Sequence, residues 1–157
     1  MGNQIKVNGD THLPIDTIKY AKPVGEEEQV AIGQRYGIDG SKFNTQLFLT
    51  TRSAPKLVQE TTDDLSAAGL ALVNIGGKFV PAANIVDAKE LDKEGRAKLR
   101  DKGYTVSDSF RSSVETVNSL VLSKAFPSQV LDRRKKALAM ADVNSSASSS
   151  EPEPTNG

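Results

Sequence analysis

The sequence predicts an α+β protein: a mainly antiparallel sheet or small β-barrel built from hairpins, followed by C-terminal helices and a disordered tail. Three observations predict this class. Two similar segments each carry the signature of a β-hairpin, strand-like alternation fills residues 1–90, and helical periodicity replaces it afterwards. We therefore expect a β-rich domain over residues 1–90, a helical segment over 91–142 and a disordered Ser/Pro/Glu tail over 143–157.

The two similar segments lie 67 positions apart. Residues 9–22 align without gaps with residues 76–89, and five of the 14 columns are identical. Each copy begins at a turn, Asn8-Gly9 or Gly76-Gly77, whose residues supply the positive φ values of a two-residue hairpin turn. Each then reaches a proline, which ends ladder pairing at the same point. The segments predict two similar hairpin units.

Further strands and one short helix are expected in the β-rich domain. The clearest strand covers residues 44–52, which are rich in β-branched and aromatic side chains. Thr62 as N-cap, acidic residues in the first turn and Gly69 at the end predict a short helix. The expected strands are 4–8, 11–15, 17–22, 29–36, 44–52, 56–61, 70–75, 78–82 and 84–88.

Helical patterns follow from residue 90. Glu90 to Lys102 reads as a helix closed by Gly103, and a final helix is expected over about Ser128 to Met140. Between them, an apolar stripe at i, i+4, i+7, i+10 and i+11 predicts an amphipathic helix that Pro127 ends. The stripe consists of Phe110, Val114, Val117, Leu120 and Val121.

Composition bounds the architecture and the charge. The chain has 157 residues, of which 37% are apolar and 5% aromatic, so it fits one domain with a modest aliphatic core. Twenty basic residues balance 20 acidic ones, and the net charge gives no argument for a nucleic-acid or membrane partner. Residues 93–136 nevertheless carry a net charge of +6 between two acidic segments, which predicts a local positive face.

The chain has no cysteine, which excludes disulfides, thiolate nucleophiles and Cys-ligated metal sites. No apolar run reaches the ~20 residues that span a bilayer. The first residues lack the layout of a signal peptide, and Lys6 stands where a myristoylation motif needs Ser or Thr. We expect a cytoplasmic protein without a membrane partner.

No motif predicts catalysis, a cofactor or a metal site. The one histidine, His12, stands where the second copy has Phe79, and a single histidine without clustered acids makes no zinc site. Glu26-Glu27-Glu28 matches no EF-hand loop and reads as a solvated loop. The expectation is a protein that is not an enzyme, although carboxylates distant in sequence leave no local trace.

The leading functional hypothesis is a protein–protein interaction or assembly module. The apolar stripe exceeds what a 90-residue β-rich core requires, so we expect it to dock onto a protein partner or onto a second copy. With no motif to suggest otherwise, we hypothesise a small phage or bacterial accessory protein.

The alternative is a nucleic-acid-binding regulatory protein. Arg133, Arg134, Lys135 and Lys136 form the one dense basic run, and such a run can neutralise phosphates. It can equally be a cationic face in a terminal helix, a placement that the helix dipole favours.

One resemblance bears on this alternative. Residues 13–20 and 78–85 resemble strand segments of LytTR-type DNA-binding domains, in which similar strands flank a hairpin and a short helix. The resemblance covers about 80 residues and rests on apolar spacing, and it assigns no binding residue to this chain.

Overall fold

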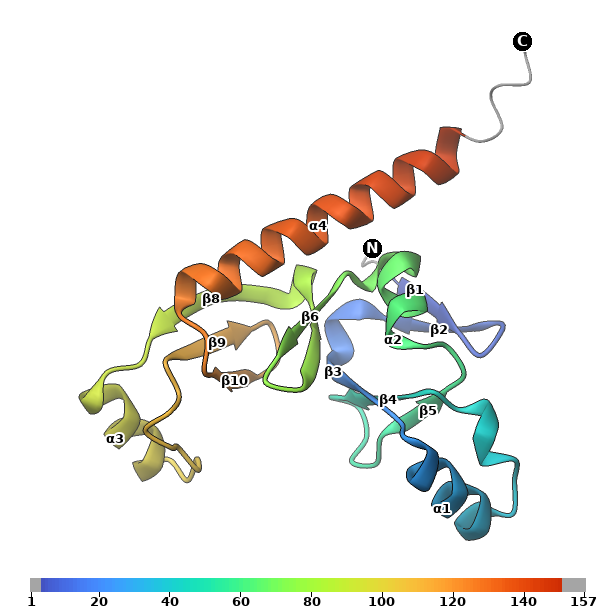
Figure 1. Ribbon diagram of the computed structural model, residues 1–157, viewed down its shortest axis with the longest axis horizontal. Coiled ribbons are helices and arrows are strands. Elements are labelled where there is room, and N and C mark those ends of the chain that lie inside the picture. The colour runs from blue at the N-terminus through green and yellow to red at the C-terminus, as the bar shows by residue number, and fades with distance from the viewer. Residues whose placement is uncertain (1–3, 151–157) are drawn as a thin grey trace.

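The chain adopts an α+β fold, and its described residues form three antiparallel sheets and four α-helices (Figure 1). This computed structural model describes residues 4–150, and the side chains of residues 4–141. The predicted class is confirmed, but the three sheets in the described part are open and form no closed barrel.

The strands are β1 (Gln4–Val7), β2 (Thr11–Pro14), β3 (Ile18–Pro23), β4 (Thr45–Leu49), β5 (Lys56–Val58), β6 (Leu72–Ile75), β7 (Lys78–Pro81), β8 (Ile85–Glu90), β9 (Ser112–Thr116) and β10 (Leu120–Ser123). The α-helices are α1 (Glu26–Tyr36), α2 (Thr62–Leu65), α3 (Lys93–Asp101) and α4 (Pro127–Ser150). Short helical turns connect them: η1 (Ile15–Thr17), η2 (Gly40–Lys42), η3 (Ser66–Leu70) and η4 (Ala82–Asn84).

The sheets divide the strands unequally. Strands β1 and β2 form a separate hairpin, the central sheet has the order β5-β4-β3-β7-β6, and the third sheet has the order β10-β9-β8. All neighbouring strands run antiparallel. The hairpin β6–β7 therefore joins a sheet whose other strands come from much earlier in the chain.

The core is divided into two apolar clusters at residue 70. The first half, residues 4–70, supplies the buried residues of the first cluster. The second half, residues 71–150, supplies those of the second cluster. The first core consists of Ile5, Val7, Ile15, Ile18, Ala21, Leu47, Leu49, Val58, Leu65 and Leu70. The second core consists of Ala71, Val73, Ile75, Val80, Ala82, Ile85, Ala88, Val114, Val121 and Val130.

The two halves have the same order of strands and α-helices, although only the first has a helical turn, η2, between its helix and the next strand. Strands β2 and β7, β3 and β8, and β4 and β9 each begin 67 positions apart. The pairing of β3 with β4 and that of β8 with β9 both shift register just after the first residue, Ile18 or Ile85. A backbone hydrogen bond is also found at the same position in both halves. Val24 N–H donates to Asn44 O at 2.9 Å, and Leu91 N–H donates to Arg111 O at 3.0 Å.

The two halves are joined by one sheet, because a strand of the second half pairs with a strand of the first. Strand β7 of the second half pairs with β3 of the first half, with Ala21 opposite Phe79. The Phe79 ring packs against the first core, and the Tyr20 ring packs against the second. Each core is thus completed by an aromatic side chain from the other half.

Helix α4 covers the second core and runs along β8, as Figure 1 shows for the orange-red helix above the sheet. Val130 is fully buried, and Leu131 and Leu138 pack against the same cluster. The Arg134 Nε donates to Ile85 O of β8 at 3.1 Å. One side of the third sheet is therefore flanked by a helix rather than by another strand.

Two predicted elements are wrong in type. Residues 29–36, expected as a strand, belong to α1, because Glu26–Glu28 in the first turn suit the helix dipole and Gly37 ends the helix at a φ of 67°. The amphipathic helix expected around the apolar stripe is replaced by β9 and β10. In β9 the buried residues Ser112, Val114 and Thr116 alternate with more exposed ones, which is the period of a strand.

Other predicted elements are present with shifted bounds. The helix expected over Glu90–Lys102 is α3, and the short helix near Thr62 is α2, whose N-cap is Thr61. The range 91–142, expected to be helical, also contains β9 and β10, and β9 pairs with β8 across that boundary. Of the predicted tail 143–157, α4 includes residues to Ser150, and residues 151–157 lie outside the described residues.

Candidate functional site: a basic groove in the second half

The predicted apolar stripe is dispersed by its folding into strands. Val114 and Val121 are 0% and 4% exposed and belong to the second core. Val117 lies 53% exposed in the turn between β9 and β10. Phe110 and Leu120 are half-buried. That any of these residues binds a partner stays a prediction.

The predicted basic run lies on α4 and its members differ in their contacts. Arg134 is anchored to β8, as described above. Lys136 forms an ion pair with Asp132 at 3.1 Å, one turn earlier on the same helix. Arg133 Nη1 donates to Asn74 O at 3.5 Å, and Lys135 is exposed. The four side chains therefore do not form one continuous face, because Arg134 is used for packing.

Arg133 instead borders a groove of about 990 Å³, which we call the basic groove. It lies between the β6–β7 turn, the loop after α3, strand β10 and the start of α4. Lys78, Lys124 and Arg133 line it, and none of the described residues that line it is Asp or Glu. The lining residues are Ile75, Gly76, Lys78, Tyr104, Thr105, Phe110, Leu120, Val121, Leu122, Ser123, Lys124, Ala125, Gln129 and Arg133.

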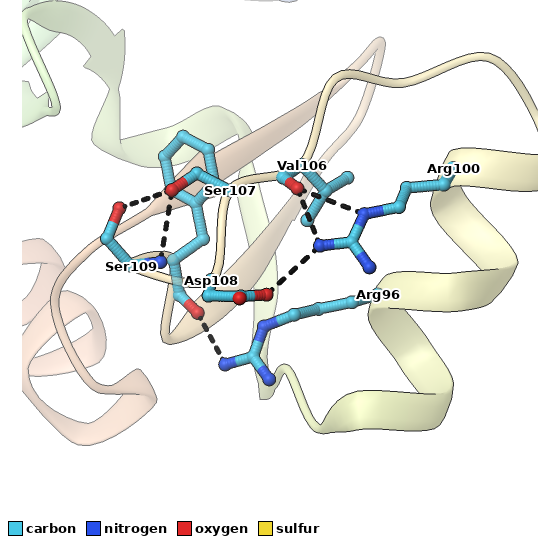
Figure 2. A network of polar contacts seen from close by, with 7 residues as sticks. Arg96, Arg100, Val106, Ser107, Asp108 and Ser109 are labelled. Atoms are coloured by element: carbon cyan, nitrogen blue, oxygen red, sulfur yellow. Dashed lines mark hydrogen bonds and ion pairs between the residues drawn. The ribbon is translucent and has the colours of Figure 1, made fainter.

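One wall of the basic groove is the loop over residues 104–110, which two arginines of α3 hold in place (Figure 2). Arg100 Nη2 donates to Val106 O at 2.8 Å and also contacts Asp108 Oδ1 at 3.1 Å. Arg96 Nη2 donates to Phe110 O at 2.9 Å. The arginines thereby hold the middle and the end of the loop, and Tyr104 N–H at its start donates to Leu99 O at 3.0 Å.

The cationic groups of the basic groove are not neutralised by carboxylates. The ion pairs among the described side chains are Arg100–Asp108 and Lys136–Asp132. Lys78 Nζ lies 4.8 Å from the centroid of the Tyr20 ring, and Arg133 contacts a backbone carbonyl. Both contacts leave the positive charge available to an anion.

At the corresponding position of the first half, beside the β1–β2 turn, hydrogen bonds of Asn8 close the surface. Asn8 of the β1–β2 turn receives Gln59 N–H on its Oδ1 at 2.8 Å and donates from Nδ2 to Leu57 O at 3.1 Å. Its backbone N–H donates to both carboxylate oxygens of Glu60 at 3.1 Å. By strand register, Gly76 and Ala125 stand where Asn8 and Glu60 stand. Because glycine and alanine lack these side chains, the second half has a groove where the first half has a clamp.

His12 lies exposed on β2, away from the basic groove. Among the described side chains, no three His, Cys, Asp or Glu residues gather into a group that could hold a metal ion. Within residues 4–150, no helix combines the length and apolar character needed to cross a bilayer. No protein-family model, curated protein or solved structure matches the chain.

Proposed function

We propose that the chain is a non-enzymatic assembly module whose copies associate through the free edge of β2. The observation that carries the proposal is the pairing of β7 with β3. Strand β7 is the counterpart of β2 in the order of elements, and it uses the edge opposite β6 to join another sheet. In the described residues, the matching edge of β2 carries no strand.

The proposal includes the inference that the chain contains two copies of one structural unit. The recurrence of strand order, register shift and loop hydrogen bonds supports it, as does the similar content of the two cores. In a chain of such units, the first hairpin of each unit adds its strands to the sheet of the unit before it, as β6–β7 does here. Among the described residues, no strand pairs with the β1–β2 hairpin at the edge of β2 opposite β1.

The outer edges of the two units differ. Strand β8 is the counterpart of β3, and α4 lies along it with Arg134 bonded to Ile85 O. Covering an edge with a helix is a common way to prevent further strand pairing. Within residues 4–150, β2 has no strand at this edge, and a free edge offers unpaired N–H and C=O groups to another strand. Two copies that pair β2 with β2 form a closed, twofold dimer.

His12 is the residue through which this pairing is tested. It is exposed on β2 and stands where Phe79 stands on β7. His12→Phe gives β2 the aromatic side chain that its counterpart uses and is expected to strengthen association. His12→Asp brings two carboxylates together in a twofold dimer, and like charges across strands cost about 0.2–1 kcal/mol per pair.

Sedimentation equilibrium over a wide concentration range measures the effect. The wild type is expected to form dimers, more strongly as His12→Phe and up to about five-fold more weakly as His12→Asp. Val117→Asp adds the same charge at an exposed turn and is expected to leave the dimer unchanged. A strict monomer for both the wild type and His12→Phe would refute the proposal. A dimer that neither change at His12 affects would refute the assignment to β2.

A further inference from the structure

We propose that the basic groove binds a single-stranded nucleic acid, with backbone phosphates on Lys78, Lys124 and Arg133 and a base stacked on Tyr104. This site does not depend on association through β2. The proposal rests on the charge of the groove, on its aromatic side chains and on its difference from the first half.

The charge of the basic groove is local, since the chain as a whole is neutral. Three cationic side chains converge from β7, from the end of β10 and from α4, and no carboxylate among the described lining residues opposes them. A surface of this kind attracts a polyanion and releases its counterions. Lysine and arginine at one groove therefore favour a chain of phosphates over a neutral or cationic ligand.

Aromatic side chains accompany the charge. Tyr104 lines the basic groove and is 43% exposed, and Phe126, next to the lining residue Ala125, is 52% exposed. The Arg111 guanidinium lies 5.7 Å from the centroid of the Phe126 ring, so a cation and a ring are presented together. Bases stack on such rings only when they are unpaired, which favours a single strand over a duplex.

Comparison of the residues at matching positions in the two halves distinguishes the charge of the basic groove from ordinary surface charge. At the position 67 residues before Lys78, the first half has Thr11. By strand register, Gln59 stands for Lys124. The cations Lys78 and Lys124 thus have no counterpart in the first half, where the clamp of Asn8 and Glu60 is present. A groove that is both opened and charged in one half, on the same backbone, indicates a ligand rather than a need of the fold.

The test uses fluorescence anisotropy with labelled oligo(dT), measured across a series of salt concentrations. Neutralising three phosphates predicts a slope of log K against log[salt] of about −2 for a single strand. The variant with Lys78, Lys124 and Arg133 all changed to Gln is expected to bring this slope close to zero. Tyr104→Ala is expected to weaken binding roughly 5- to 150-fold while leaving the slope unchanged.

A matched control removes the same charge elsewhere. Lys89, Lys93 and Lys135 are exposed and do not line the basic groove, and changing all three to Gln is expected to leave binding near the wild-type value. The proposal is overturned by the absence of oligo(dT) binding at low salt, or by an equal loss in the control variant. Equal or tighter binding of a duplex of the same length or of polyglutamate would replace the single strand as the ligand.

Discussion

Asn84 joins the two halves through a buried amide. Its side chain is 3% exposed, and Nδ2 donates to Ile15 O at 2.9 Å and to Ile18 O at 3.0 Å, both in the first half. Asn84→Ala leaves Ile15 O buried without this donor, so we expect the free energy of unfolding to fall by about 1–3 kcal/mol. Urea denaturation followed by circular dichroism measures the change.

Asn118 provides the comparison for Asn84. Its Nδ2 also donates into the first half, to Asp16 O at 2.8 Å and to Ile18 O at 3.1 Å, but its side chain is half-exposed and water can replace it. Asn118→Ala is therefore expected to cost about 0.5–1.5 kcal/mol. If Asn84→Ala costs no more than Asn118→Ala, burial of the Asn84 amide is not what joins the halves.

Asp39 has a carboxyl group whose pKa is held below its ordinary value. The Ser41 hydroxyl donates to Asp39 Oδ1 and is the main cause, and the Ser41 backbone N–H adds a second bond at 3.1 Å. Because the pKa is lower in the folded state, these bonds stabilise the fold above the ordinary value of 3.8, and the contribution is lost as pH falls through the folded pKa. Asp39 is exposed, so the effect on stability is small.

Ser41→Ala is expected to raise the pKa of Asp39 toward 3.8 without reaching it, because the backbone bond remains. A titration of the side-chain carboxyl by NMR measures this shift directly. Ser41→Thr keeps a hydroxyl and is expected to keep the lowered pKa. An unchanged pKa in Ser41→Ala would show that the hydroxyl is not its cause.

At the scale of elements, the sequence predicts those turns and helices that are determined by residues close together in the chain. The hairpin turns at Gly9 and Gly76 and the presence of α2 and α3 follow from turn and cap residues, although α2 is capped by Thr61 and α3 begins only at Lys93. The pattern of residues 112–123 predicts a helix wrongly, because two short strands joined by a tight turn can place apolar residues at helical spacing. Only the pairing of β9 with β8, some 25 residues earlier, decides between the two.

The candidate site was predictable only in part for the same reason. Arg133 and Phe110 are singled out by a basic run and an apolar stripe, but Lys78, Lys124 and Tyr104 come from three other segments. These three residues lie near one another only in the folded chain, so no local sequence pattern predicts that they share a groove. A usable signal was the 67-residue spacing, which sets Lys78 against Thr11 and would have marked a change of charge between equivalent positions.

Helix α1 is an element that no buried residue of its own holds in place. Gln29 Nε2 donates to Phe43 O at 2.8 Å, and the backbone of Gly40 approaches Gln29 so closely that an added Cβ would overlap the Gln29 carbonyl. Gly40→Ala therefore pushes η2 away from α1. Overpacking of this kind costs about 1–3 kcal/mol. We expect amide hydrogen exchange in α1 to rise roughly 5- to 150-fold.

Gly25→Ala is the control for this prediction. A Cβ at Gly25 would meet only Glu28 Oε1, at 3.9 Å, and the φ of −80° suits alanine. Gly25 is the N-cap of α1, where alanine is less favourable than glycine, so exchange is expected to rise only modestly and only in the first turn. If Gly40→Ala leaves α1 equally protected, the close approach of η2 does not hold the helix.

At the scale of the whole molecule, the exchange of β7 makes the two cores interdependent. Phe79 belongs to the second half and packs against the first core, while Tyr20 belongs to the first half, packs against the second core and stacks on Phe48 at 4.6 Å. Neither half can be completed without a ring from the other. We therefore expect the chain to unfold in a single transition, although it contains two cores.

Phe79→Ala tests this coupling because it removes one ring from the shared sheet. A fully buried phenylalanine costs about 3–5 kcal/mol when changed to alanine, and Phe79 is only half-buried, so about 2–4 kcal/mol is expected. Hydrogen exchange read by mass spectrometry should show the same loss of protection in β4 of the first half and β9 of the second. Phe43→Ala, beside η2, should affect the α1 region alone. If β9 keeps its protection while β4 loses it in Phe79→Ala, the halves unfold separately, and the exchanged strand joins two independent folding units.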